Sequence, residues 1–224
     1  MLIKTQNLFD LDKTIAKDYL LGYEIPWQAL GGISEYIIKL GKTLPRETFD
    51  EKNENVWIAK SAKVAPTAFI SSPCIIDENA EIRHNAFIRG SAIIGKNAVV
   101  GNSTELKNCI LFDYVQVPHF NYIGDSILGY RVHLGAGAVT SNVKSDKSYV
   151  TINVNGKRIQ TGLKKFGAII SDNTEVGCNA VLCPGTVLGR NVTVYPTSMV
   201  RGFIEENTIF KNDGSSKQKI KAVD

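Results

Sequence analysis

Between residues 58 and 106 the sequence reads IAKSAKVAPTAFISSPCIIDENAEIRHNAFIRGSAIIGKNAVVGNSTEL, and an aliphatic residue recurs in it at every sixth position. The members of this series are Ile58, Val64, Ile70, Ile76, Ile82, Ile88, Ile94, Val100 and Leu106. From Val64 onward a small residue stands two positions before each member: Ala62, Ala68, Cys74, Ala80, Ala86, Ala92, Ala98 and Thr104. A helix repeats about every 3.6 residues and a strand about every 2, so neither element sustains a period of six.

This period predicts a parallel β-helix, in which each hexapeptide forms one short strand and one turn. The aliphatic side chain points into the prism, and the small residue fits a crowded corner. Equivalent positions stack from coil to coil, so the aliphatic side chains form columns that no single coil could bury alone. The rhythm shortens near Leu111, resumes at Val117, slips again at Leu128, returns at Leu134 and restarts over residues 170–200.

The segments that flank the repeat do not share its period. Residues 1–50 predict a short helical appendage, with Asp10 as a cap and Gly41 as the end of a second helix. We expect the appendage to pack on the first coil and to hide its open strand edge, with an oligomer contact as the alternative. Residues 51–204 are assigned to the β-helix and residues 205–224 to a polar C-terminal tail.

The repeat is interrupted at about residues 140–165. Two β-rich runs flank Asn155-Gly156, a pair that favours a two-residue hairpin turn. Basic residues surround this predicted hairpin: Lys144, Lys147, Lys157, Arg158, Lys164 and Lys165. Such an insertion is either a solvated loop or a place for binding groups.

Composition narrows the class of protein. The 224 residues are 43% hydrophobic and 21% charged, which is typical of a folded domain. No apolar run approaches the roughly 18 residues of a membrane span, and the first residues lack the pattern of a signal peptide. The net charge of +4 suits a phosphorylated ligand but is too small to indicate nucleic acid. With its four cysteines interpreted as reduced thiols, the chain is expected to be cytoplasmic, with no membrane or nucleic-acid partner.

One block of the repeat carries groups suited to chemistry. It comprises Asn102–Lys107, Val117–Asp125, His133–Gly137 and Thr140–Asn142. The imidazole of His119 can accept a proton at physiological pH. Cations suited to a phosphate stand at Arg89, Lys107 and Lys147, Asn142 adds an amide, and the glycines beside Ala136 leave backbone exposed.

The hexapeptide pattern resembles that of the left-handed β-helix acyltransferases, in which three hexapeptides make one triangular coil. The block from Asn102 to Ala136 resembles, without a gap, the acetyltransferase half of the bifunctional enzymes that join glucosamine-1-phosphate N-acetyltransferase to N-acetylglucosamine-1-phosphate uridyltransferase. It is more similar still to archaeal-type sugar-1-phosphate nucleotidylyltransferases with such a domain. The resemblance covers about residues 56–204 and implies the left hand of the coil and a homotrimer.

By this resemblance, the chain is expected to be an N-acetyltransferase of the UDP-N-acetylglucosamine pathway that uses acetyl-CoA and an amino-sugar-1-phosphate. His119 falls on the general base that deprotonates the amine for attack on the thioester. Arg89 and Lys107 fall on residues that hold the sugar phosphate, and Tyr122 on one that contacts the sugar. Asn142 matches an asparagine between the sugar and the thioester.

Four further positions are assigned by the same resemblance. Lys147 matches a lysine near the substrate, while Ala136 and Cys178 line the acetyl-CoA channel, Cys178 in place of a serine. His133 stands where the bifunctional enzymes carry an asparagine that touches the sugar. No metal is required for the acyl transfer. Because no glycine-rich nucleotide loop lies near the N-terminus, no nucleotidyltransferase activity is expected.

Two other classes remain open from the sequence. The γ-class carbonic anhydrases share the left-handed β-helix and bind zinc through three histidines, but the nearest pair among His84, His119 and His133 is fourteen residues apart. Cys178 and Cys183 are spaced too widely for a common zinc knuckle. The third class is a non-catalytic solenoid that binds a sugar phosphate or acts as a scaffold. The sequence does not distinguish glucosamine from galactosamine or define the acyl group.

Overall fold

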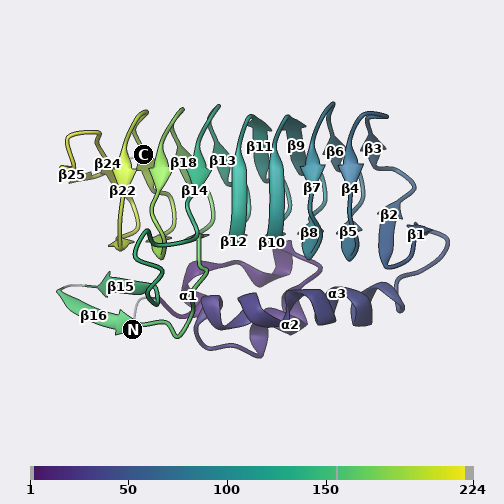
Figure 1. The fold of residues 1–224 in the computed structure, drawn as a ribbon, viewed down its shortest axis with the longest axis horizontal. Coiled ribbons are helices and arrows are strands. Elements are labelled where there is room, and N and C mark those ends of the chain that lie inside the picture. The colour runs from purple at the N-terminus through teal and green to yellow at the C-terminus, as the bar shows by residue number, and fades with distance from the viewer. Residues whose placement is uncertain (1–2, 155, 220–224) are drawn as a thin grey trace, which may run out of the picture.

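The computed structural model describes residues 3–154 and 156–219, which form a β-solenoid with helices along one side (Figure 1). The helical elements are α1 (Thr5–Leu8), the 3₁₀ turn η1 (Leu11–Lys13), α2 (Lys17–Leu21), the 3₁₀ helix η2 (Pro26–Gly32) and α3 (Ile33–Gly41). No helix in this described part is long and apolar enough to cross a membrane.

The solenoid strands stack into two long sheets. The first contains β1 (Phe49–Asn53), β2 (Val56–Ala59), β4 (Phe69–Ile70), β5 (Cys74–Ile76), β7 (Phe87–Ile88), β8 (Ala92–Ile94), β10 (Glu105–Leu111), β12 (Tyr122–Leu128), β14 (Val139–Thr140), β17 (Ala168–Ile170), β19 (Val181–Leu182), β20 (Thr186–Leu188), β22 (Met199–Val200) and β23 (Phe203–Ile204). The second contains β3 (Lys63–Val64), β6 (Glu81–Ile82), β9 (Val99–Asn102), β11 (Gln116–His119), β13 (His133–Leu134), β18 (Glu175–Val176), β21 (Thr193–Val194), β24 (Thr208–Phe210) and β25 (Ser216–Gln218). The left-handed parallel β-helix with a helical N-terminal appendage and an inserted hairpin is therefore confirmed.

The register explains the rhythm of the sequence. Cys74 pairs with Ala92, which is three hexapeptides further on, whereas Ala92 pairs with Cys109 one residue earlier than three hexapeptides would place it. The shortened coil matches the slip near Leu111. From Ile76 onward the aliphatic members of the repeat are almost completely buried: Ile76, Ile82, Ile88, Ile94, Val100 and Leu106. Each such burial contributes roughly 1.5–3 kcal/mol, so these columns supply most of the solenoid's cohesion. In the first coil the prediction fails, because Val64 is exposed and Ile58 and Ile70 are only half-buried.

The appendage lies along the side of the solenoid, not over the edge of the first coil as expected. Helix α3 contacts β5, β8 and β10, and η2 contacts β12. The reason is the amphipathic character of α3, which buries Ile33 and Ile37 completely and needs an apolar face to cover them. The first edge is instead paired by β1, which runs antiparallel to β2.

Helix α3 ends at Gly41 as predicted, but Gly41 is its last helical residue and the C-cap is Lys42, in a right-handed conformation. A Cβ atom at Gly41 would lie 2.2 Å from the ring of Trp57, so glycine is needed for close packing. Asp10 does act as a cap, because its carboxylate accepts a hydrogen bond from the N–H of Asp12 at the start of η1.

The predicted hairpin is formed by β15 (Thr151–Val154) and β16 (Lys157–Gln160), which pair antiparallel. Of its predicted turn, Asn155 lies outside the described residues. The side chains of Val150 and Ile152 are fully buried, so this end of the hairpin packs on the solenoid. Basic side chains therefore project from an insertion that is anchored by apolar contacts.

Past residue 204 the chain continues the solenoid. Strand β24 stacks in parallel on β21, and β25 pairs antiparallel with β24. The expected polar tail thus contributes two strands, because Thr208 is buried and Phe210 lies beside Val194 in the next coil, in a sequence that is otherwise polar. Residues 220–224 of that tail lie outside the described residues.

Asp77 carries a buried carboxyl group at the corner that follows β5. Its side chain is 1% exposed, and Oδ1 accepts a hydrogen bond from the N–H of Glu78. Oδ2 is the one buried side-chain polar atom without a hydrogen-bond partner in residues 3–154 and 156–219. Burial raises the pKa of Asp77 to about 6. Between its unfolded pKa of about 3.9 and this value, only the folded state retains the proton, so stability falls as the pH rises through this window.

We therefore expect Asp77→Asn to stabilise the protein at pH 7.5 by up to about 3 kcal/mol, because no charge is then buried. Below about pH 3 the variant and the parent should be similarly stable, since Asp77 is then mostly protonated in both the folded and the unfolded state. Urea unfolding at the two pH values measures the difference. An unchanged or lower free energy of unfolding at pH 7.5 contradicts the prediction.

Candidate functional site

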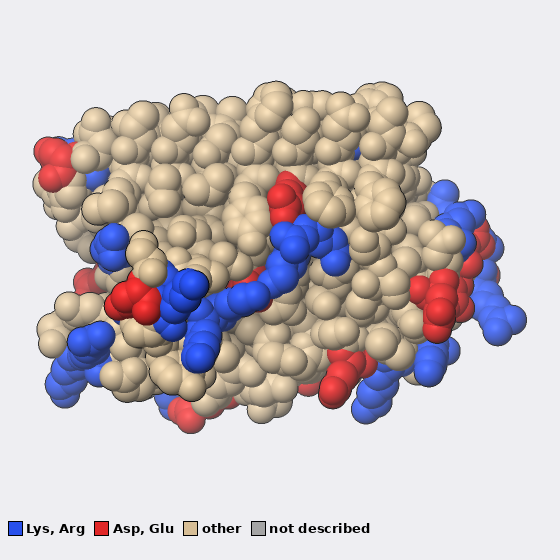
Figure 2. All heavy atoms as spheres, viewed as in Figure 1, with Lys and Arg blue, Asp and Glu red and all other residues tan. Residues whose placement is uncertain are grey.

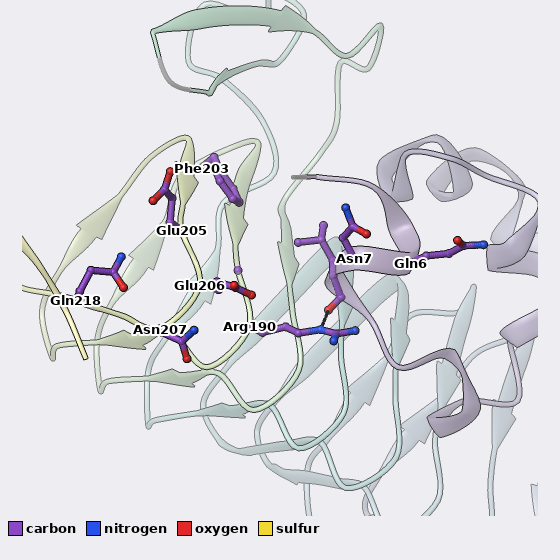
Figure 3. Close-up of a pocket in the computed structure, with 10 residues that line it drawn as sticks. Gln6, Asn7, Arg190, Phe203, Glu205, Glu206, Asn207 and Gln218 are labelled. Atoms are coloured by element: carbon purple, nitrogen blue, oxygen red, sulfur yellow. Dashed lines mark hydrogen bonds between the residues drawn. The ribbon is translucent and has the colours of Figure 1, made fainter. Parts of the chain in front are cut away.

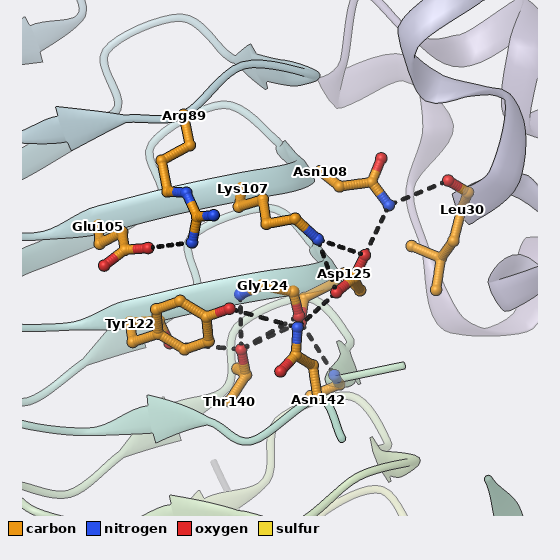
Figure 4. A network of polar contacts seen from close by, with 12 residues as sticks. Leu30, Arg89, Glu105, Lys107, Asn108, Tyr122, Gly124, Asp125, Thr140 and Asn142 are labelled. Atoms are coloured by element: carbon orange, nitrogen blue, oxygen red, sulfur yellow. Dashed lines mark hydrogen bonds and ion pairs between the residues drawn. The ribbon is translucent and has the colours of Figure 1, made fainter. Parts of the chain in front are cut away.

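A buried carboxylate organises the polar groups at one corner of the solenoid (Figure 4). Asp125 is 4% exposed and accepts hydrogen bonds from three side chains. Lys107 Nζ lies 3.4 Å from each carboxylate oxygen, Asn108 Nδ2 lies 2.9 Å from Oδ1, and the amide of Asn142 donates to Oδ2. Asn142 also donates to the hydroxyl of Tyr122 at 3.2 Å. We call Lys107, Asn108, Tyr122, Asp125 and Asn142 the Asp125 network.

Stacking of the coils brings these residues together. In the parallel pair β10 and β12, Glu105 lies beside Tyr122 and Lys107 beside Gly124. In the next coil Thr140 pairs with Ile123, which places Asn142 level with Asp125. Residues that are 17 positions apart in the sequence are therefore neighbours across a strand spacing of about 4.8 Å.

The cations at this corner are accessible but already paired with carboxylates. Arg89 lies 2.8 Å from Glu105, which raises the pKa of the guanidinium, and Lys107 faces Asp125. An exposed ion pair such as the first is weak, so a phosphate can replace its carboxylate. Burial, followed by the charge of Asp125, raises the pKa of Tyr122, so its hydroxyl stays protonated at neutral pH. The corner can thus offer cations and a neutral phenol to an anion.

The predicted base and the two predicted acetyl-CoA positions stack in one column at a second corner. The N–H of Gly137 donates to the carbonyl of His119 at 3.0 Å, and the N–H of Asn179 donates to the carbonyl of Ala136 at 2.8 Å. These bonds place His119, Ala136 and Cys178 in successive coils, which we call the His119 column. The side chains of His119 and Cys178 are exposed, so both are open to a ligand on the outside of the solenoid.

Two predicted site residues lie apart from both groups. His133 Nδ1 is 2.8 Å from Glu175 Oε2 on the outside of the second sheet. Lys147 is exposed in the segment before the hairpin, where its N–H donates to the carbonyl of Lys144. Within the described ranges, no hydrogen bond or ion pair joins the imidazole of His119 to the Asp125 network. In a single chain the predicted site is therefore divided over separate surfaces.

Sequence reasoning gave no role to three residues that the structure places in this region: Glu105, Asn108 and Asp125. Asp125 was part of the unusual block, but its importance depends on partners in neighbouring coils. Their spacing in the sequence could have indicated this, because Asn108, Asp125 and Asn142 follow one another at intervals of 17 residues. That spacing equals the shortened coil and puts all three at one corner.

Phe120, which follows His119, adopts an unusual backbone conformation. Phe120 has a φ of 52°, in the left-handed region that large side chains rarely adopt, and its ring is 62% exposed. Equivalent corners of other coils carry Ser103, Gly137 and Asn179, which tolerate this conformation better. The aromatic ring thus stands in solvent next to the predicted base.

The three histidines occupy separate places. His84 Nδ1 lies 2.9 Å from the hydroxyl of Thr67, whereas His133 pairs with Glu175. Among the residues that the structure describes, no group of three or more His, Cys, Asp or Glu side chains is arranged to hold a metal ion. The donor set therefore does not fit the zinc site of the carbonic anhydrase alternative within one chain.

A large pocket lies away from the predicted site. It has a volume of about 750 Å³ and is found where α1 meets the C-terminal coils (Figure 3). Arg190 crosses this junction, where its Nε donates to the carbonyl of Leu8 at 3.3 Å. The lining includes Glu205 and Glu206 and none of the predicted site residues. We assign it to the junction between the appendage and the solenoid.

Part of the chain matches a known protein family. A family described as the GMPPB C-terminal domain matches residues 70–165, a range that contains the block from Asn102 to Ala136. The match covers 96 of the 224 residues, which is less than half of the chain.

Particular relatives are bifunctional proteins. The chain is 34% identical over 109 residues to the bifunctional sugar-1-phosphate nucleotidylyltransferase/acetyltransferase of Sulfurisphaera tokodaii, which is 49% of this chain and 27% of that protein. It is 35% identical over 113 residues to the bifunctional protein GlmU of Methanococcus vannielii, with coverage of 50% and 27%. The predicted resemblance to the hexapeptide-repeat acetyltransferase domain is confirmed, although the chain spans about a quarter of the length of these curated relatives.

A solved structure with a related shape is a mutant of AntD, an N-acyltransferase from Bacillus cereus, in complex with dTDP and coenzyme A. The TM-score is 0.41 at 17% identity, with 79% of this chain and 93% of that chain covered.

Asp125 should be the residue on which the polar corner depends. Asp125→Ala leaves one ammonium and two amides without their acceptor, so we expect a loss of about 2–3 kcal/mol in the free energy of unfolding. Asp146→Ala is the matched control, because Asp146 also pairs with a lysine but is exposed. Urea unfolding compares the two variants, and equal losses would show that Asp125 does not organise the corner.

Proposed function

We propose that this protein is an acetyl-CoA-dependent N-acetyltransferase acting on an amino-sugar-1-phosphate, either glucosamine-1-phosphate or galactosamine-1-phosphate. The observation that carries the proposal is the assembly of Lys107, Tyr122 and Asn142 around Asp125, inside the range 70–165 that matches the GMPPB C-terminal domain. A scaffold does not need a lysine, a phenol and an amide held at one corner by a buried acid.

His119 is the general base of the proposed reaction. Its imidazole accepts a proton from the sugar's neutral amine as the amine nitrogen forms its bond to the acetyl carbonyl carbon. The carbon–sulfur bond of the thioester breaks, and the thiolate leaves with the electron pair. The proton held by His119 passes to that sulfur, which regenerates the neutral base. No metal is required in this sequence of steps.

The remaining residues bind the two substrates. Arg89 and Lys107 hold the sugar phosphate through charge-assisted hydrogen bonds to its oxygens. Tyr122 and His133 contact the sugar, Asn142 lies between the sugar and the thioester, and Lys147 approaches the substrate. The acetyl-CoA arm runs along the His119 column past Ala136 and Cys178.

A homotrimer is the proposed assembly. In one chain the His119 column and the Asp125 network lie at different corners of the solenoid, so a neighbouring chain is needed to bring a base to the sugar-binding corner. We place the reaction in the cytoplasm, in the UDP-N-acetylglucosamine pathway, with no nucleotidyltransferase activity in these 224 residues.

The primary test mixes the purified protein with acetyl-CoA and either sugar phosphate, and follows the free thiol of coenzyme A. We expect turnover that His119→Ala reduces by about 10²–10⁴-fold, the usual contribution of a positioned base. The ratio of rates identifies the sugar. Absence of turnover in a folded trimer with both sugars would favour the alternative, a non-catalytic protein that binds a sugar phosphate.

The phosphate-binding role of Lys107 makes a separate prediction. Lys107→Met should raise the KM for the sugar phosphate about tenfold and change kcat little, because one charge-assisted bond to the phosphate is lost. Lys96→Met serves as the control, since Lys96 pairs with Glu78 on another part of the solenoid. Steady-state kinetics with varied sugar phosphate measure both constants. A KM equal to that of the control removes Lys107 from the phosphate site.

A further inference from the structure

A second cavity lies where the inserted hairpin meets the C-terminal coils, and we call it the hairpin cavity. Its volume is about 450 Å³, and its lining comes from the segment before the hairpin, from both hairpin strands and from two solenoid corners: Lys144, Thr151, Asn153, Arg158, Pro184, Arg201 and Gly202. Of these seven described residues three are cationic and none is acidic. The proposed acetyl transfer makes no use of them.

The three cations are held differently. Arg158 Nε donates to the hydroxyl of Thr151 at 3.1 Å, which orients the guanidinium and leaves its terminal nitrogens for a ligand. Lys144 Nζ lies 3.2 Å from Asp146, so its charge is partly offset. Arg201 has no ion pair among the residues that the structure describes. The carboxylate of Asp146 therefore neutralises at most one of the three cations, and the net charge around the cavity is positive.

Close packing fixes this arrangement. The buried side chains of Val150 and Ile152 anchor the first hairpin strand on the solenoid. Gly202 has a φ of 74°, and a Cβ atom there would lie 3.0 Å from the carbonyl oxygen of Asn153. Glycine thus permits the hairpin to approach the corner that carries Arg201. Cations from separate segments are held around one space before any ligand arrives.

The geometry points to a nucleotide-diphosphate site: we propose that the hairpin cavity binds the diphosphate group of a nucleotide. A guanidinium donates two parallel hydrogen bonds to phosphate oxygens, and two arginines with a lysine complement two linked phosphates. The volume lies within the roughly 300–1,000 Å³ of small-molecule sites. Thr151 and Asn153 add uncharged polar groups next to the cations.

This site is separate from the Asp125 network. The register places Lys107, Gly124, Ser141, Cys183 and Arg201 along the same corner in successive coils. Four coil spacings separate Lys107 from Arg201, which is about 19 Å. Figure 2 shows Lys and Arg side chains gathered in the band between the solenoid and the elements below it. The diphosphate comes either from coenzyme A or from a nucleotide-linked sugar, and the site does not depend on acetyl transfer.

Calorimetric titration with inorganic pyrophosphate, coenzyme A and UDP tests the proposal on the full chain. The key variant is R158Q/R201Q, which keeps the polar character of both exposed positions. Lys157→Gln is the matched control, because it removes a neighbouring hairpin charge that does not line the cavity. Lys107→Met removes a cation of the Asp125 network, four coils away along the same corner, and it separates the two sites.

We expect pyrophosphate to bind the parent, Lys157→Gln and Lys107→Met alike, and to bind R158Q/R201Q at least about tenfold more weakly. Tighter binding of coenzyme A than of UDP, lost in the same double variant, identifies the acyl donor as the source, and the reverse order identifies a nucleotide-linked sugar. No binding to the parent, or an equal loss in Lys157→Gln, overturns the proposal. If the protein shows no acetyltransferase activity but binds pyrophosphate in this pattern, the proposed function fails and the diphosphate site stands.

Discussion

The stacking of aliphatic side chains from coil to coil is the constraint on which the whole structure depends. A two-residue or three-residue strand has little stability alone, but stacking stabilises it, as β8 shows by pairing in parallel with both β5 and β10 and burying Ile94. Because the side chains in a column must align, a coil without an insertion has 18 residues or is shortened to 17, and to 16 at the C-terminal end of the solenoid. Any insertion must leave and re-enter the solenoid at the same register, as residues 141–167 do between β14 and β17.

This constraint also arranges the chemistry. Outward side chains at one position of each coil form columns as regular as those of the core, so polar groups far apart in sequence become neighbours. Asp125 depends on such a column for its donors Lys107 and Asn142, and the His119 column follows the same rule at another corner. The buried carboxylate offsets the desolvation of the groups around it, since its oxygens accept from three donors.

The appendage and the hairpin add what a bare solenoid lacks. Both are anchored by apolar side chains, Ile33 and Ile37 in α3 and Val150 and Ile152 beside the hairpin. The appendage reaches the polar corner directly, because the amide of Asn108 donates both to Asp125 and to the carbonyl of Leu30. A change in the appendage is thereby connected to the residues that we propose to hold the sugar phosphate.

The sequence by itself determined the solenoid, the helical and hairpin insertions and the block that contains Asp125. The period of six is typical of a parallel β-helix, and a two-residue hairpin turn depends only on the residues at the turn itself. The sequence did not determine the place of the appendage, the close packing of Gly41 on Trp57 or the extension of the solenoid to β24, since each depends on contacts between distant segments. The role of Asp125 likewise required the register, which converts a spacing of 17 residues into hydrogen bonds. Only the tertiary structure decided that Lys144, Arg158 and Arg201 share one cavity, because the hairpin's position is set by burial and not by its own sequence.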